Sequence, residues 1–97
     1  MPYIDLTPSA EFEYDHLSDK ARAAVDRCLD YIERVGMRSQ YVSKIRGEYD
    51  MYLARASNDI RIVLQKEGSH IIVVSIISRD KLHRMSGQYN WYKGGPK

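Results

Sequence analysis

Two adjacent apolar segments in the second half of the chain constrain its fold more than any other feature. Residues 59–65 (DIRIVLQ) and 70–79 (HIIVVSIISR) are rich in β-branched residues, and the turn-forming sequence KEGS separates them. A similar segment, EYDMYLARA at residues 48–56, precedes them and ends at the polar sequence SND. Connections of this length join neighbouring strands in antiparallel hairpins. The sequence therefore predicts an antiparallel sheet in this half of the chain.

The first half of the chain predicts one short strand and two helices. PYIDL is the strand candidate, and the first helix begins after it with Thr7 as N-cap and Pro8 at the first helical position. The second helix begins at Ser18 or Asp19 and ends at Gly36. Its apolar residues recur at helical spacing and predict one buried stripe: Ala21, Val25, Cys28, Leu29, Ile32 and Val35.

These elements predict a single α+β domain over residues 1–97. The expected order is β-α-α-β-β-β, with two N-terminal helices packed on one face of a small, mostly antiparallel sheet. The basic sequence MRSQYVSKIRG, after the second helix, is expected to be an irregular connection. Residues 80–85 are expected to form a short helix and residues 86–97 an aromatic C-terminal tail. Because both N-terminal helices cover the same face, we expect the other face of the sheet to be bare.

Composition gives no sign of secretion or of a membrane span. A chain of 97 residues with 43% hydrophobic and 29% charged residues is typical of one globular domain. Cys28 has no cysteine partner and lies on the apolar stripe, so we expect a packing thiol rather than a disulfide or a nucleophile. The N-terminal sequence is acidic, and the longest apolar run, IIVVSII, is too short to cross a bilayer. We therefore expect a cytoplasmic protein with no membrane partner.

Charge is divided unevenly along the chain. Residues 1–37 hold four Lys or Arg against eight Asp or Glu, whereas residues 38–97 hold eleven against five. The net charge of +2 therefore combines an acidic first part with a basic second part. This division is consistent with one face for a polyanion, and equally with chance in a short chain.

Two arginines lie on the strands that carry the most apolar residues. Alternation along residues 59–65 places Ile62 beneath the helices and Arg61 and Val63 on the open face. Both parities of the next strand are apolar; if the set that contains Ser75 faces away from the helices, Arg79 lies on the same side as Arg61. Two guanidinium groups on a rigid sheet suit a phosphate, because each planar fork makes two charge-assisted hydrogen bonds. The alternative is a pair of surface arginines bridged to neighbouring carboxylates, Asp59 and Asp80.

Four short motifs follow the predicted helices in order: Lys44-Ile45-Arg46-Gly47, Arg55, Ile60-Arg61-Ile62 and Ile76-Ile77-Ser78-Arg79. Together they resemble the RelE/ParE superfamily of bacterial toxins, over nearly the whole chain. The family pattern has a Lys-Leu-x-Gly-like entry, a strand with an Arg, a turn, and an Arg between apolar residues. It ends with an apolar strand that closes on a basic residue. Each fragment is short, so the resemblance depends on their order and spacing.

The resemblance implies a toxin that a cognate antitoxin holds inactive, with one of two targets. RelE-like members cleave mRNA in the ribosomal A site and need no metal, whereas ParE-like members keep the fold and inhibit DNA gyrase. For a nuclease, the resemblance implies that Arg61 and Arg79 stabilise the phosphate at the cleavage site. Further cations would contact RNA: Lys44, Arg46, Arg55, Lys81 and Arg84. Arg55 could equally serve the structure of its strand.

The chain departs from the nuclease pattern at two places. Tyr52 and Ala54 stand on a strand where the family usually has basic residues, and no Tyr closely follows the last strand. His83 is the nearest substitute, because an imidazole can act as acid or base; an exposed His on a short helix is the alternative. The departures leave a gyrase inhibitor, or a homologue without catalysis, as the other interpretation. His16 and His70 have no ligand-like companions, so we expect no metal or cofactor.

Overall fold

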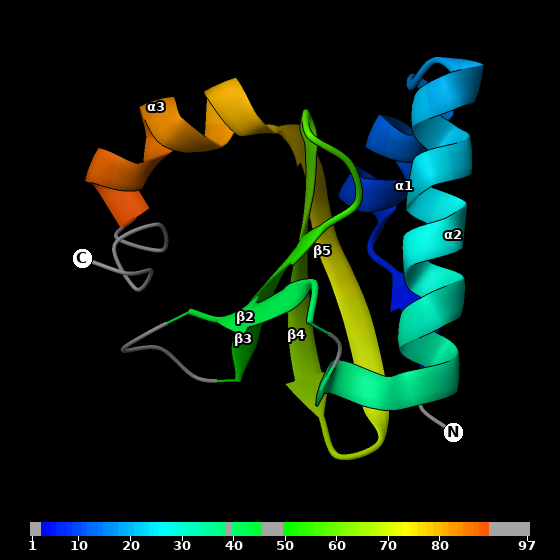
Figure 1. The fold of residues 1–97 in the computed structure, drawn as a ribbon. Coiled ribbons are helices and arrows are strands. Elements are labelled where there is room, and N and C mark those ends of the chain that lie inside the picture. The colour runs from blue at the N-terminus through cyan, green and yellow to red at the C-terminus, as the bar shows by residue number, and fades with distance from the viewer. Residues whose placement is uncertain (1–2, 39, 46–49, 90–97) are drawn as a thin grey trace.

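The secondary structure of the chain follows the predicted order, with one strand added. In the computed structural model, five strands form one sheet in the order β1-β5-β4-β3-β2 (Figure 1). β1 and β5 run parallel, and all other neighbours are antiparallel, so the predicted α+β class and hairpins are confirmed. The strands are β1 (Tyr3–Leu6), β2 (Val42–Lys44), β3 (Met51–Arg55), β4 (Ile60–Glu67) and β5 (His70–Ser78). The structure describes residues 3–38, 40–45 and 50–89.

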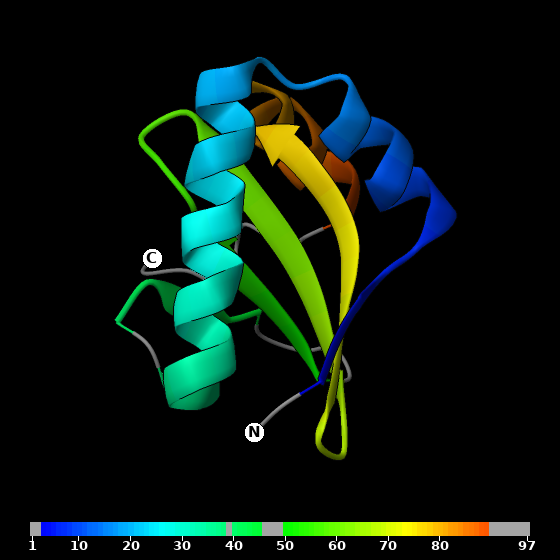
Figure 2. The same ribbon diagram turned by 90° about the vertical axis from the view of Figure 1, so that its right-hand side faces the viewer.

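α1 (Pro8–Asp15) and α2 (Asp19–Val35) begin at the predicted caps. The Thr7 side chain accepts a hydrogen bond from the Ala10 N–H, and that of Ser18 accepts one from the Ala21 N–H, each at 3.1 Å. Figure 2 shows α2 in front of the sheet and α1 beside the end of β5. Among the described residues, none of the helices has the length and apolar content that a membrane span requires.

The main core lies between α2 and the sheet. Ile62 and Leu64 of β4 are fully buried in one cluster with Val25 and Ile32 of α2, as alternation along β4 and the helical stripe predict. Each side chain of this size contributes about 1.5–3 kcal/mol when it is buried. The core therefore fixes which face of β4 is turned towards the helices.

The segment expected to be an irregular connection contains a strand, Val42–Lys44, so that prediction is wrong. Hydrogen bonds to β3 extend to both sides of it: the Arg55 N–H donates to the Tyr41 carbonyl and the Ile45 N–H to the Met51 carbonyl, each at 2.9 Å. As an edge strand it is held by the ladder to β3 rather than by an apolar face. Its sequence therefore lacks the β-branched pattern by which the other strands are recognised.

β5 is irregular at its centre. Leu64 pairs with Val73 but Val63 pairs with Ser75, which leaves Val74 as a β-bulge. The bulge reverses the alternation, because the core-facing residues of β5 are Ile71 and Val73 before it and Ile76 after it. Regular parity along the whole of β5 is therefore a wrong prediction.

α1 closes the edge of β5 beyond the point where β1 ends. The Thr7 hydroxyl donates to the Val74 carbonyl at 3.2 Å. The Glu13 carboxylate accepts hydrogen bonds from the Ile76 N–H at 2.8 Å and from the Ser75 hydroxyl at 3.1 Å. The carboxylate thus takes the place of the carbonyl that a further strand would supply.

The second face of the sheet is partly covered by α3 (Arg79–Tyr89), on the side opposite to α1 and α2 (Figure 1). α3 contacts β4 and β5, and its Leu82 is fully buried. Val63, which the sequence places on an open face, is also fully buried. The expectation of a bare face is therefore wrong where α3 lies. The helix also continues through residues 86–89, which the sequence assigns to the tail.

Candidate nucleic-acid interface

Arg55 and Arg61 lie opposite each other at the ends of neighbouring strands. They form a direct pair between β3 and β4, so both side chains leave the same face, with Cβ atoms about 4.5–5.5 Å apart. The next pair along the ladder, Ala54 with Ile62, is fully buried in the main core. The Cα–Cβ bonds of both arginines therefore leave the face opposite to α2. Arg55, the last residue of β3, also borders a cleft beside α2, where its carbonyl oxygen lies 3.9 Å from the Cys28 Sγ. Like charges in directly opposed positions destabilise a sheet, which favours an anion or other acceptors beside them.

The Arg61 guanidinium is held by the turn between β3 and β4. Its Nη1 donates to the carbonyl oxygens of Ser57 at 2.7 Å and of Asn58 at 3.2 Å. These bonds offset part of the desolvation of a half-buried cation. They also fix the position of the group at the end of the sheet.

Arg79 stands at the same end of the sheet. It is the first residue of α3, and its backbone N–H donates to the Asp59 carbonyl in the β3–β4 turn at 2.7 Å. Its side chain is exposed, and within the described part of the chain neither its guanidinium nor that of Arg55 makes a hydrogen bond or an ion pair. Within the described residues, neither Asp59 nor Asp80 therefore neutralises Arg79, which was the alternative interpretation. Arg55, Arg61 and Arg79 therefore all stand at one end of the sheet.

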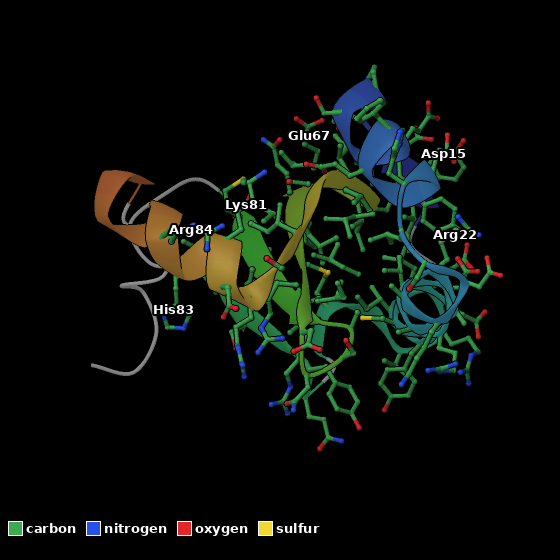
Figure 3. All side chains as sticks on the ribbon, turned by 90° about the horizontal axis from the view of Figure 1, so that it is seen from above. Asp15, Arg22, Glu67, Lys81, His83 and Arg84 are labelled. Atoms are coloured by element: carbon green, nitrogen blue, oxygen red, sulfur yellow. The ribbon has the colours of Figure 1, made fainter. Side chains whose placement is uncertain are left out.

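α3 divides its basic side chains between two sides. His83 follows Arg79 by four residues in a continuous helix, so the two lie on one side of it. Figure 3 shows Lys81 and Arg84 on the side of α3 away from His83. All four side chains are exposed. The helix thus places Arg79 and His83 on one side, as the sequence predicts, and Lys81 and Arg84 on another side.

Lys44 does not join the three arginines. It pairs with Tyr52, where its Nζ lies 5.3 Å from the ring centroid and 3.9 Å from a carboxylate oxygen of Asp50. Tyr52 packs against the main core and Ala54 is buried in it, so both positions where the family pattern has cations face α2. Arg46 lies outside the described residues.

The other two histidines make local contacts. His70 Nε2 lies 3.1 Å from a carboxylate oxygen of Asp5 on the neighbouring strand, and the His16 ring lies 4.1 Å from that of Phe12 on α1. In the part of the chain that the structure describes, no group of three or more His, Cys, Asp or Glu residues is placed to hold a metal ion.

A second cationic feature, not predicted from the sequence, lies along α2. A cleft of about 490 Å³ separates α2 from Tyr41 and the end of β3. Cys28 lines it and packs partly against the core, as predicted for a packing thiol, and burial raises the pKa of the thiol. The signal was present in the sequence, because Arg27, Tyr31 and Arg34 recur at the spacing of one helix side. Residues 1–37 as a whole carry a net negative charge, so the charge count for this part of the chain does not indicate a cationic site on α2.

Solved structures with the same fold include chains of toxin–antitoxin complexes. A chain of the YoeB dimer from Staphylococcus aureus superposes with a TM-score of 0.66 at 22% identity, over 78% of this chain and 94% of that one. A chain of the Escherichia coli RelBE toxin–antitoxin complex gives 0.68 at 21% identity, over 79% and 95%. A chain of the Mycobacterium tuberculosis RelBE2 complex gives 0.67 at 19% identity, over 81% and 100%. Neither a protein-family model nor a curated protein sequence matches the chain.

The fold and the three arginines place the chain among small α+β domains with two helices on one face of the sheet and a cationic sheet end. Within that class it has the RelE-like fold of the RelE and YoeB structures. The fold that the sequence resemblance implies is therefore confirmed.

Proposed function

We propose that this chain is the toxin of a type II toxin–antitoxin pair and that it inhibits translation in the cytoplasm by cleaving mRNA on the ribosome. The observation that carries the proposal is the gathering of Arg55, Arg61 and Arg79 at one end of a RelE-like sheet. Arginine is suited to this role because its fork binds two phosphate oxygens and its charge does not titrate near neutral pH.

The proposed reaction uses the RNA itself as nucleophile. The ribose 2′-oxygen attacks the adjacent phosphorus while a base takes its proton, the P–O5′ bond breaks, and an acid protonates the leaving 5′-oxygen. The products are a 2′,3′-cyclic phosphate and a 5′-hydroxyl. Arg61 and Arg79 stabilise the charge that develops on the phosphate oxygens. His83, on the same side of α3 as Arg79, supplies the proton for the leaving group.

A cognate antitoxin is the second part of the proposal. Chains with this fold are described in a YoeB–YefM complex from Staphylococcus aureus and in RelBE toxin–antitoxin complexes. An acidic segment of the antitoxin that lies across the arginines would exclude RNA from them. Ribosome and mRNA would be the partners when the antitoxin is absent.

One observation favours a different target. By alternation, Met51 and Leu53 accompany Arg55 on the outer face of β3, so the strand presents a single cation there. A ParE-like inhibitor of DNA gyrase, or a homologue that acts only by binding protein, needs no further cations. This is the second candidate function.

Arg79→Ala tests the nuclease. Because the Arg79 guanidinium makes no bond within the described part of the chain, its loss should abolish growth inhibition and mRNA cleavage without lowering the unfolding temperature. Arg79→Lys should restore activity only partly, since an ammonium lacks the bidentate fork. Cleavage is measured by primer extension on mRNA from induced cells, with Lys20→Ala on α2 as the control.

Two results would contradict the proposal. Full activity of Arg79→Ala would show that Arg79 is a surface residue that takes no part in cleavage. Inhibition of gyrase supercoiling by the unmodified protein, without mRNA cleavage, would replace the nuclease by the second candidate.

A further inference from the structure

We propose that the cleft along α2, lined by Arg27, Cys28, Tyr31, Arg34, Tyr41 and Arg55, binds one unpaired RNA nucleotide next to the cleaved phosphate. This inference rests on the proposed RNA substrate. Arg55 connects the two places, because it lines the cleft and also pairs directly with Arg61 across the β3–β4 ladder. An RNA strand whose phosphate lies on Arg61 would therefore meet the cleft at its next or preceding nucleotide.

The aromatic wall of the cleft is built in advance. Tyr31 and Tyr41 meet edge to face, with centroids 6.0 Å apart and planes at 70°. The Arg34 guanidinium carbon lies 5.6 Å from the Tyr31 centroid, and its Nε donates to the Asp30 carboxylate at 3.3 Å. Tyr41, which also lines the cleft, is 43% exposed. Base–aromatic stacking accepts any base, since every base has a π-face.

The charge of the cleft is positive and only partly compensated. Asp30 neutralises Arg34, whereas within the described part of the chain the guanidinium groups of Arg27 and Arg55 make no hydrogen bond or ion pair. Arg27 on α2 and Arg55 at the end of β3 both line the cleft, and both residues are exposed. The phosphate of a nucleotide bound in the cleft would be attracted by the charges of both Arg27 and Arg55.

A nucleotide fits these features better than an acidic peptide does. The carboxylates of an acidic peptide would pair with the guanidinium groups, but they could not stack on the tyrosine ring. A volume of about 490 Å³ is within the range of small-ligand sites, about 300–1,000 Å³. Cations that follow the backbone beside an aromatic platform are the usual means of holding single-stranded nucleic acid.

The test measures binding to an RNA that cannot be cleaved: a fluorescein-labelled octaribonucleotide with 2′-O-methyl groups throughout, followed by fluorescence anisotropy. Arg27→Glu should weaken binding about tenfold and lower the slope of log affinity against log salt by about 0.7 or more, because a phosphate contact is lost. Tyr41→Leu should weaken binding about fivefold or more with the slope unchanged, and Tyr41→Phe should bind normally. Lys20→Glu is the matched control, with the same charge change on the same helix outside the cleft.

Cys28 provides a readout at the site itself. Bound octaribonucleotide should slow alkylation of this thiol by N-ethylmaleimide in the unmodified protein and not in Arg27→Glu. Unfolding temperatures of all variants are measured beside the binding constants, so that loss of the fold is recognised.

Two results would overturn the inference. The first is unaltered affinity of both Arg27→Glu and Tyr41→Leu. The second is an octaglutamate peptide that displaces the RNA and protects Cys28 equally well, with no effect of Tyr41→Leu; this would make the cleft an acidic-protein site. Failure of the proposed function is separate: cleft-dependent binding without cleavage in cells would reject the nuclease alone.

Discussion

Arg61 and Arg79 reach the same end of the sheet by different means, and this changes what their substitution would do. The Arg61 guanidinium donates to two carbonyls of the β3–β4 turn, so Arg61→Ala would loosen that turn as well as remove a cation. The Arg79 side chain makes no such bond in the described chain. Loss of activity in Arg79→Ala therefore reports on the cation itself.

His83 is the residue on which the proposed proton transfer depends. We expect His83→Ala to slow ribosome-dependent mRNA cleavage about 10²-fold or more, the usual contribution of a positioned proton donor. His83→Gln should do no better, because it keeps the polarity but has no group that titrates. Primer extension gives the rates, and His16→Ala on α1 is the control. Undiminished cleavage by His83→Ala would remove this residue from the mechanism and leave a scheme that uses the arginines alone.

At the scale of elements, α3 makes both faces of β4 sensitive to charge. Ile62 and Val63 are both fully buried, on opposite faces of the strand. We expect Ile62→Asp and Val63→Asp each to lower the free energy of unfolding by about 3 kcal/mol or more, because each buries a carboxylate without a partner. Urea denaturation measures both, with Gln65→Asp, half-buried on the same strand, as the control. If Val63→Asp is tolerated as well as Gln65→Asp, α3 does not exclude water from this face.

The attachment of α1 to β5 predicts a second effect on stability. Glu13→Ala would leave the Ile76 N–H without its acceptor and should cost about 1–3 kcal/mol of unfolding free energy. Glu13→Gln keeps an acceptor oxygen and should recover most of the loss. Hydrogen exchange of the Ile76 amide should quicken in the alanine variant only. Equal losses from Glu13→Ala and from Glu11→Ala, an exposed residue on the same helix, would contradict this role.

At the scale of the whole molecule, the cationic end of the sheet favours an antitoxin with an acidic segment. We expect growth inhibition when the chain is expressed alone, and rescue when the adjacent reading frame is expressed with it. The two proteins should co-purify. Their association rate should fall several-fold between about 50 and 200 mM salt, because the steering charges are screened. Equal growth with and without the adjacent frame, and no co-purifying small protein, would exclude a toxin.

The features that depend only on residues close together in the sequence could be predicted from the sequence alone. The caps at Thr7 and Ser18, the end of α2 at Gly36 and the alternation of β4 are all as predicted. Gly36 has φ of 81°, a left-handed conformation that glycine adopts without strain. Each of these features is set by contacts within one turn of helix or between adjacent strand residues. The sequence therefore determined the class of the fold, and together with the family resemblance it named Arg61, Arg79 and His83 as the candidate residues.

Tertiary structure decided what depends on contacts between distant segments. The bulge at Val74 comes from the register of β5 against β4, and the strand Val42–Lys44 is held by its ladder to β3. Val63 is fully buried where α3, which contacts β4 and β5, folds back over a face that alternation alone leaves open. The cleft exists because α2 and the end of β3 stand apart. No local period in the sequence encodes such distances, since they result from how the side chains of separate elements fill the space between them.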